Sequence, residues 1–227
     1  MAFTLDQVIP WGRCLDEYIE MFDLNLESLR GEKILDCGGG PASFNQEMTN
    51  QGYSVMSCDP IDQWTGAEIS QRIAETYPKV VRGLTENLGD YVWHKIKSPE
   101  HLGQVRMAAM SKFLEDFERG KVAGRYQIGG VPGLPFATQE FNLALCSHLL
   151  FSYSEQLSLE FHIASVLDLC RVAEEVRIFP LITIGMEPSR WVPGVLTALS
   201  EAGYQFEVKT VVYEFQKGGN QMLRIRQ

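Results

Sequence analysis

Three consecutive glycines follow an acidic residue in the segment 33–44, whose sequence is KILDCGGGPASF. A short apolar run leads to Asp36, and Gly38, Gly39 and Gly40 come almost directly after it. Because glycine has no Cβ, the backbone there can adopt positive φ angles and approach a ligand closely. The pattern predicts a strand that ends in a ligand-binding turn and continues into a helix.

Two widespread glycine-rich motifs do not fit this turn. The dinucleotide motif G-x-G-x-x-G, counted from Gly38, requires a glycine or alanine where the chain has Ser43. The phosphate-binding loop requires a lysine followed by Ser or Thr after the glycines, and this segment has none. The remaining pattern is an acid followed by G-x-G-x-A, from Asp36 to Ala42.

A second acidic residue follows the next apolar run. Residues 53–58 read YSVMSC, and Asp59 and Pro60 come directly after them. A carboxylate can accept hydrogen bonds from both hydroxyls of a ribose, and ribose-binding acids stand about 20 residues beyond such glycines. We therefore expect Asp59 and the glycine turn to contact the same ligand.

The pattern from Asp36 to Ala42 resembles motif I of the class I S-adenosylmethionine (SAM)-dependent methyltransferases, in which an acid precedes G-x-G-x-[GA]. The resemblance covers residues 31–60 and 125–227. It implies that SAM is the cofactor, that Asp59 binds its ribose, and that Pro60 next to Asp59 is also a cofactor-binding residue. The residues that it places around the methionine part of SAM are Asp36, Cys37, Gly38, Gly39 and Gly40.

A second passage is similar to small-molecule members of this family, which carry L-P-F followed by F-D-[LV]. This chain has LPF at 134–136 and FNL at 141–143, so Asn142 replaces the usual aspartate. Many members also carry an acid after the third strand that binds the adenine amine. Here Gly129 and Gly130 stand at that place, which leaves the adenine contact open.

Ser147 and His148 follow the expected strand at 141–146, at the edge of the sheet where open α/β proteins bind ligands. We expect both near the transferred methyl group. The imidazole of His148 is suited to accept a proton from the methyl acceptor, and the alternative is that it only lines the SAM pocket. Arg13 is suited to bind the SAM carboxylate, and the alternative is a surface arginine at a helix start.

The remaining pattern predicts a three-layer, Rossmann-like α/β fold in a single domain, residues 1–227. A helical segment at 11–30 precedes the first strand, and the run KGGN at 217–220 predicts a tight turn between strands 206–215 and 221–226. A strand at 176–183 would contain Pro180, which removes a ladder hydrogen bond. The family resemblance implies seven strands in the order 3-2-1-4-5-7-6, with the last strand antiparallel.

Residues 61–124 form an insertion between the second and third strands. Their pattern predicts helices at 67–77, 80–97 and 99–119. Because the insertion follows the carboxyl end of a strand, we interpret it as a cap over the substrate, which selects the acceptor. An enlarged helical layer without substrate contact is the alternative.

Composition restricts the partners. The formal net charge of −9 over 227 residues disfavours a nucleic-acid substrate. No apolar run reaches the length of a membrane span, and the first ten residues lack a signal-peptide pattern, so we expect a cytoplasmic protein without membrane association. Five cysteines without a C-x-x-C pair indicate neither a disulfide framework nor a metal site. A homodimer stays open.

Together these features predict a SAM-dependent methyltransferase that acts on a small-molecule acceptor. Whether oxygen, nitrogen or sulfur is methylated is undetermined. A SAM-binding protein without transferase activity, in regulation or assembly, is the first alternative. A dinucleotide or nucleotide-sugar enzyme is the second, which the missing third glycine disfavours.

Overall fold

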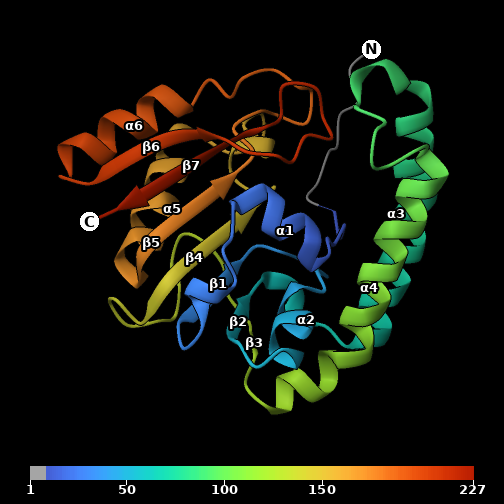
Figure 1. Cartoon of the computed structure of the whole chain (residues 1–227), viewed down its shortest axis with the longest axis horizontal. Coiled ribbons are helices and arrows are strands. Elements are labelled where there is room, and N and C mark those ends of the chain that lie inside the picture. The colour runs from blue at the N-terminus through green and yellow to red at the C-terminus, as the bar shows by residue number, and fades with distance from the viewer. Residues whose placement is uncertain (1–8) are drawn as a thin grey trace.

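The computed structural model describes residues 9–227. The predictions of a single domain and of no signal peptide also include residues 1–8, which lie outside the described part. Within it, one seven-stranded sheet has the order β3-β2-β1-β4-β5-β7-β6 (Figure 1). The strands are β1 (Lys33–Cys37), β2 (Ser54–Cys58), β3 (Tyr126–Gln127), β4 (Phe141–Ser147), β5 (Ala173–Phe179), β6 (Gln205–Thr210) and β7 (Gln221–Arg226).

The first five strands are mutually parallel, and β7 is antiparallel to both β5 and β6. The sequence prediction of an α/β fold with this strand order is therefore confirmed. Parallel strands bring all their carboxyl ends to one edge of the sheet. The glycine turn after β1, Asp59 after β2 and His148 after β4 consequently lie at the same edge.

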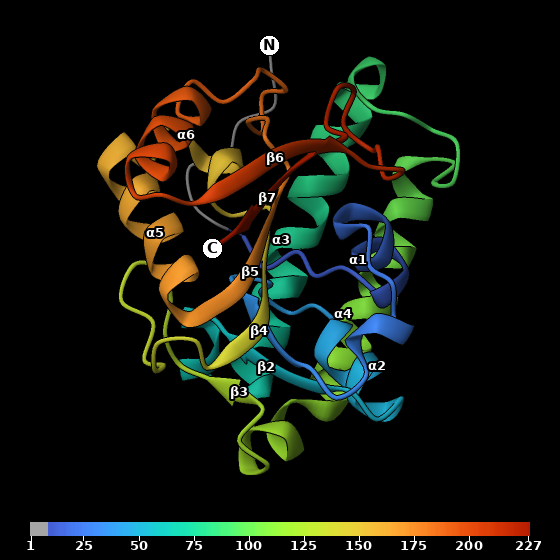
Figure 2. The same ribbon diagram turned by 60° about the vertical axis from the view of Figure 1, so that its left-hand side comes forward.

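Helices cover both faces of the sheet (Figures 1 and 2). Side chains alternate along β1, so Ile34 packs with the helices of one face and Leu35 with those of the other. The first face carries α1 (Leu15–Phe22) and α2 (Phe44–Asn50), and the second carries α5 (Leu159–Val172) and α6 (Val192–Glu201). Short 3₁₀ turns occur at Glu27–Leu29, Pro60–Gln63, Leu88–Asp90 and Phe151–Tyr153.

The insertion is built on two long helices, α3 (Gly66–Glu86) and α4 (Pro99–Val122), which run side by side along one edge of the molecule (Figure 1). The helices predicted at 67–77 and 80–97 are wrong in their bounds: α3 is one helix as far as Glu86, and residues 91–97 are not helical. Pro78 lies inside α3, with its ring exposed to solvent. Apolar contacts on both sides of it, through Ile73 and Val80, outweigh the lost backbone hydrogen bond.

Several other predicted boundaries also move. The helical segment 11–30 contains an eight-residue helix that ends at Asp23, which adopts a left-handed φ of 49°. β5 stops before Pro180, so the predicted ladder defect does not arise. β6 stops at Thr210, and residues 211–220 form a loop with the glycines at its tip. The tight two-strand hairpin predicted there is therefore a longer loop.

The far end of the insertion contacts this β6–β7 loop. Tyr91 forms an antiparallel bridge with Gln216, and the Val92 amide donates to the Phe215 carbonyl at 2.8 Å. The rings of Tyr91 and Phe215 stack with centroids 4.9 Å apart. Although the insertion leaves the sheet beside β2, it reaches the loop between the last two strands.

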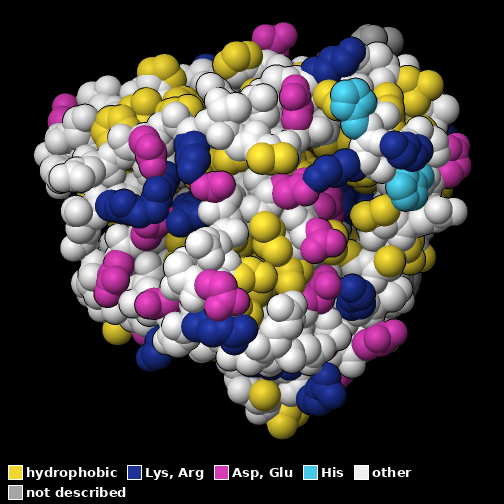
Figure 3. Space-filling view, viewed as in Figure 1, with side chains coloured by type: hydrophobic (Ala, Val, Ile, Leu, Met, Phe, Trp, Pro, Cys, Tyr) yellow, Lys and Arg dark blue, Asp and Glu magenta, His cyan; other side chains and the backbone are white. Residues whose placement is uncertain are grey.

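The surface mixes charges of both signs. Figure 3 shows acidic and basic side chains interspersed over the face seen in Figure 1. Among residues 9–227, no helix combines the length and the apolar character that crossing a bilayer requires.

Candidate functional site

A cavity of about 460 Å³ lies at the carboxyl edge of the sheet, a volume within the usual range for small-molecule sites. One part of its wall comes from the glycine turn and the segments after β2 and β4. Further parts come from the N-terminal segment, the insertion, the segments beside β3, α5 and β5, and the β6–β7 loop. Of the predicted site residues, those that line it are Arg13, Gly38, Gly39, Gly40, Asp59, Pro60, Ser147 and His148.

The glycine turn has the geometry that its sequence predicts. Gly38 and Gly40 adopt φ angles of +70° and +57°, which L side chains rarely take. A Cβ at Gly40 would meet nothing within 4 Å, so this glycine faces open space. A Cβ at Gly39 would lie 2.5 Å from Asp36 Oδ2, and the turn therefore packs directly on that carboxylate.

Asp36 supports the turn from below and does not line the cavity. It accepts hydrogen bonds from the Tyr18 hydroxyl at 2.9 Å and the Ser57 hydroxyl at 3.3 Å. Burial raises the pKa of Asp36 to about 7, with a further contribution from Asp59, although the Tyr18 hydrogen bond opposes the shift. Asp36 is predicted to contact the ligand directly. In the structure it instead shapes the glycine backbone that lines the cavity.

Cys37 also lies beneath the turn and is absent from the cavity wall. It is paired in register with Cys58 on β2 and Cys146 on β4, and all three are fully buried in one apolar cluster. Burial raises the pKa of each of these thiols above its ordinary value. Protonated thiols pack as small apolar groups, so the Cys37 side chain contributes to the core.

Asp59 joins the two loops at the cavity. Its Oδ2 accepts from the Gly40 amide at 2.9 Å, and its Oδ1 accepts from the Ile61 amide at 2.8 Å. Burial raises the pKa of Asp59, and these two backbone hydrogen bonds oppose the shift. Each oxygen keeps a lone pair for a further donor, which is what a ribose diol requires.

Ser147 and His148 form a hydrogen-bonded pair, with Ser147 Oγ 2.9 Å from His148 Nδ1. The His148 backbone has a left-handed φ of 53°, and its amide donates to the Phe179 carbonyl at 2.7 Å. Burial, together with the charges of Arg13 and Arg106, lowers the pKa of His148 well below its ordinary value. The imidazole is consequently neutral at physiological pH.

Arg13 lies beside the glycine turn. Its carbonyl accepts from the Ser43 amide at 3.0 Å, and a Cβ at Gly12 would overlap the Pro41 carbonyl. The guanidinium lines the cavity, where Nη1 donates to the Trp11 carbonyl and the buried Nε has no partner. Burial and the neighbouring Arg106 lower the pKa of Arg13. A guanidinium without an ion-pair partner among residues 9–227 is suited to an anionic ligand group.

Three residues that were not predicted from the sequence, Arg106, Glu17 and Tyr213, form a buried cluster at the cavity. Arg106 on α4 forms an ion pair with Glu17 on α1, and Tyr213 donates to Glu17 at 3.0 Å. Burial raises the pKa of Glu17, but the charge and hydrogen bond of Arg106 outweigh it, and the net shift is downward. One signal was available: Arg106 follows Leu102 and precedes Met110 at helical spacing, on the apolar side of α4.

No family model matches this sequence. The chain is 31% identical over 226 residues to a protein of Methanocaldococcus jannaschii described as "Uncharacterized protein MJ0045". The alignment covers 98% of each chain. The likeness therefore extends over the insertion as well as the sheet.

Three solved methyltransferases resemble the fold at low identity. Magnesium protoporphyrin IX methyltransferase from Synechocystis PCC 6803 with bound SAM is 12% identical, with 87% of this chain and 70% of that chain covered and a TM-score of 0.44. A SAM-dependent methyltransferase from Aquifex aeolicus is 13% identical, with coverages of 92% and 90% and a TM-score of 0.39. A TehB-like SAM-dependent methyltransferase from Corynebacterium glutamicum is 13% identical, with coverages of 87% and 80% and a TM-score of 0.43. These scores are too low to carry an argument about ligand or activity.

Proposed function

We propose that this chain, which belongs to the same protein family as the Methanocaldococcus jannaschii protein MJ0045, is a SAM-dependent methyltransferase acting on a small-molecule acceptor. One observation carries the proposal. In a sheet of order 3-2-1-4-5-7-6, the glycine turn and the Asp59 carboxylate face one cavity at the carboxyl edge, where open α/β sheets bind ligands.

The residues at this edge fit SAM. Gly40 leaves open space where a side chain would stand, Asp59 retains acceptor capacity for a diol, and Arg13 has a buried Nε without a partner. These groups suit the methionine part, the ribose and the carboxylate of SAM respectively. When bound, SAM would supply a methyl group that passes from its sulfonium sulfur to an acceptor lone pair, while the electron pair of the broken C–S bond stays on sulfur.

The protein contributes mainly alignment and exclusion of water. Holding both reactants in line replaces a bimolecular encounter, which is worth up to about 7–11 kcal/mol in favourable cases. The insertion and the β6–β7 loop supply part of the wall of the cavity. This arrangement supports the interpretation of residues 61–124 as a cap that selects the acceptor.

His148 is proposed as the group that receives the acceptor's proton. It lines the cavity next to Ser147 and is neutral, so it can accept a proton. Its low pKa makes it a weak base, which suits an acceptor that loses its proton as the methyl group arrives. An acceptor that is already a good nucleophile would need His148 only for positioning.

Calorimetric titration with SAM, S-adenosylhomocysteine (SAH) and NAD tests the proposal. We expect SAM and SAH to bind and NAD to show no binding. Tight NAD binding without SAM binding would refute the proposed function. SAM binding without transfer of a radioactive methyl group to any compound of a small-molecule library would favour a binding protein.

The role of Asp59 has a separate test. Asp59→Ala should weaken SAM binding at least about tenfold, which corresponds to about 1.4 kcal/mol. Asp62→Asn is the matched control, because Asp62 is a buried acid of the same segment that does not line the cavity. An unchanged SAM affinity in Asp59→Ala would exclude Asp59 from the site.

A further inference from the structure

β6 forms one edge of the sheet. It pairs with β7 along its whole length, and no other strand of residues 9–227 pairs with its outer side. In Figure 2, β6 runs along the top of the sheet and α6 lies to one side of it. The strand contains no proline, and its register with β7 is uninterrupted. A regular edge of this kind is a template for a further strand.

The backbone groups on the outer side of β6 belong to alternate residues. The Val211 amide donates to the Asn220 carbonyl at 2.8 Å, in continuation of the β6–β7 register. Because hydrogen-bonded and non-hydrogen-bonded pairs alternate in an antiparallel ladder, the amides and carbonyls of Phe206, Val208 and Thr210 point away from β7. These amides and carbonyls have no hydrogen-bond partner within the described part of the chain.

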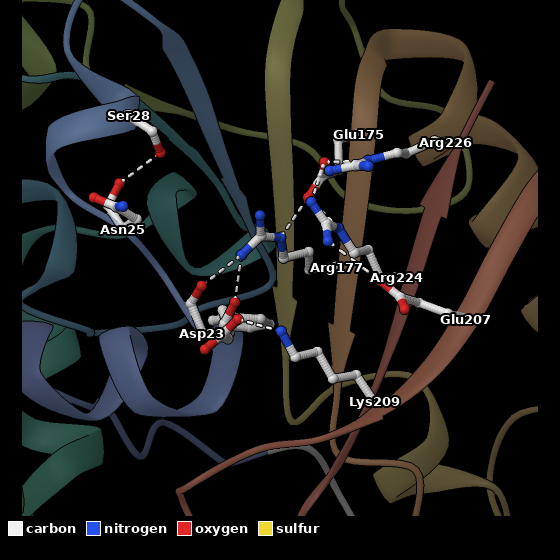
Figure 4. A network of polar contacts seen from close by, with 10 residues as sticks. Asp23, Asn25, Ser28, Glu175, Arg177, Glu207, Lys209, Arg224 and Arg226 are labelled. Atoms are coloured by element: carbon white, nitrogen blue, oxygen red, sulfur yellow. Dashed lines mark hydrogen bonds and ion pairs between the residues drawn. The ribbon is translucent and has the colours of Figure 1, made fainter.

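The side chains of β6 carry opposite charges two positions apart. Glu207 and Lys209 lie on the same face of the sheet, where Glu207 pairs with Arg224 and Lys209 with Asp23 (Figure 4). These exposed ion pairs leave 56% of the Glu207 side chain and 39% of the Lys209 side chain accessible to solvent. Between them, Val208 is 42% exposed on the other face. Both charges can therefore meet a further charge of opposite sign.

A two-fold axis at Val208 places unlike charges opposite each other. In an antiparallel pair of β6 strands centred there, Glu207 of each copy stands across from Lys209 of the other. Val208 then pairs with its own copy and Phe206 pairs with Thr210, so all the outward backbone groups are used. An axis one residue earlier or later would place two Glu207 or two Lys209 side chains opposite one another, which is destabilising.

We propose that β6 is a homodimer interface, at which two copies of this chain pair antiparallel about Val208 and form one continuous sheet. A second copy fits this edge better than an unrelated strand, because self-pairing supplies the opposite charge to both Glu207 and Lys209. Lysine on an edge strand ordinarily opposes pairing. Here Glu207 of the second copy removes that obstacle.

The proposed dimer leaves the cavities independent. None of the residues of β6 lines the cavity, which lies at the carboxyl edge of the sheet. Antiparallel pairing points the two β6 strands in opposite directions, so the two carboxyl edges face opposite ways. Dimerisation through β6 therefore neither covers the cavity nor contributes a residue to it.

Sedimentation equilibrium of the full chain tests the proposal. The measurement covers about 5 to 500 µM protein in about 0.15 M salt, which screens the repulsion between two chains of net charge −9. We expect a monomer–dimer equilibrium with a Kd on the order of 100 µM or tighter, as suits an interface built on one strand. A protein that stays monomeric over this range would overturn the proposal.

Val208→Pro tests the centre of the interface. Proline removes an amide that points away from β7, and edge strands tolerate proline at such positions. We expect the dimer Kd to rise at least about tenfold, while circular dichroism and SAM affinity stay as in the wild type. A dimer that survives in a folded Val208→Pro variant would place the interface elsewhere and overturn the proposal.

Charge exchange tests the register without changing the backbone. Glu207→Lys and Lys209→Glu each place like charges opposite one another, and each should raise the dimer Kd about fivefold or more. The double variant restores unlike pairs and should return to within about threefold of the wild-type Kd. Glu86→Lys is the matched control, because it makes the same charge change at an exposed position of α3. Equal Kd values for all these variants would overturn the register.

SAM affinity separates this proposal from the proposed function. Because the β6 residues lie outside the cavity wall, all these variants should bind SAM within about threefold of the wild type. A monomeric protein that binds SAM overturns only the dimer. A dimer that obeys the charge exchange but binds no SAM refutes only the methyltransferase assignment.

Discussion

Two arginine–glutamate clusters stand at opposite ends of the sheet and differ in their surroundings. In the first, Arg106 pairs with Glu17 at the cavity, and the Arg106 side chain is 1% exposed. In the second, Glu175 accepts from three arginines (Figure 4). Glu175 lies near the start of β5 and pairs in register with Arg226 near the end of β7, so this second cluster is far from the carboxyl edge.

The two clusters differ in what they leave unsatisfied. The Arg226 side chain is 53% exposed, and water can complete its hydrogen bonds. The Nε of Arg106 is buried without a partner and lies at a cavity. The same residue types therefore join strands at one end of the sheet and leave a buried donor without a partner at the other. Burial decides the difference, because water can complete the hydrogen bonds of an exposed side chain but not those of a buried one.

The largest expected effect tests this contrast directly. Arg106→Met should lower the free energy of unfolding by about 3–5 kcal/mol, because Glu17 would remain buried without its counter-ion. Adding Glu17→Gln should restore most of that loss. Urea unfolding followed by circular dichroism measures both variants. A single variant as stable as the wild type would show that solvent reaches Glu17.

Asp36 extends the comparison to a buried acid without an ion-pair partner among residues 9–227. Its folded pKa of about 7 lies above the ordinary value of 3.8, so the folded state binds the proton more tightly. The contribution of Asp36 to stability therefore falls as pH rises from about 4 to 7, by on the order of 3 kcal/mol. Asp36→Asn should gain stability relative to the wild type over this range, as urea midpoints at pH 5 and 7.5 would measure. A constant difference would contradict the raised pKa.

The smallest effect is expected at Arg226, the exposed arginine of the second cluster. Arg226→Ala should change the free energy of unfolding by less than about 0.5 kcal/mol, because an exposed ion pair gains little over hydration. The same urea assay in 0.05 and 0.5 M salt measures it, and salt should reduce the effect further. A loss comparable to that of Arg106→Met would remove the contrast between the clusters.

Local patterns in the sequence determined the elements and part of the site. The apolar run at 33–37, the glycines after it and Asp59 predicted a shared turn, because residues that follow neighbouring parallel strands meet at one edge. Helix boundaries in the insertion were harder to predict. The predicted helices at 67–77 and 80–97 divide α3, which packing against α4 keeps continuous through Pro78.

Tertiary structure alone decided which residues reach the cavity. Asp36 belongs to the motif yet lies beneath the turn, since the pleat of β1 directs it toward Tyr18. Glu17, Arg106 and Tyr213 are separated from one another by 89, 107 and 196 positions in the sequence, and no local pattern links them. Their contact depends on how the insertion and the β6–β7 loop meet over the sheet. The sequence by itself therefore determined the glycine turn and its carboxylate, and long-range packing determined the apolar wall and the buried arginine.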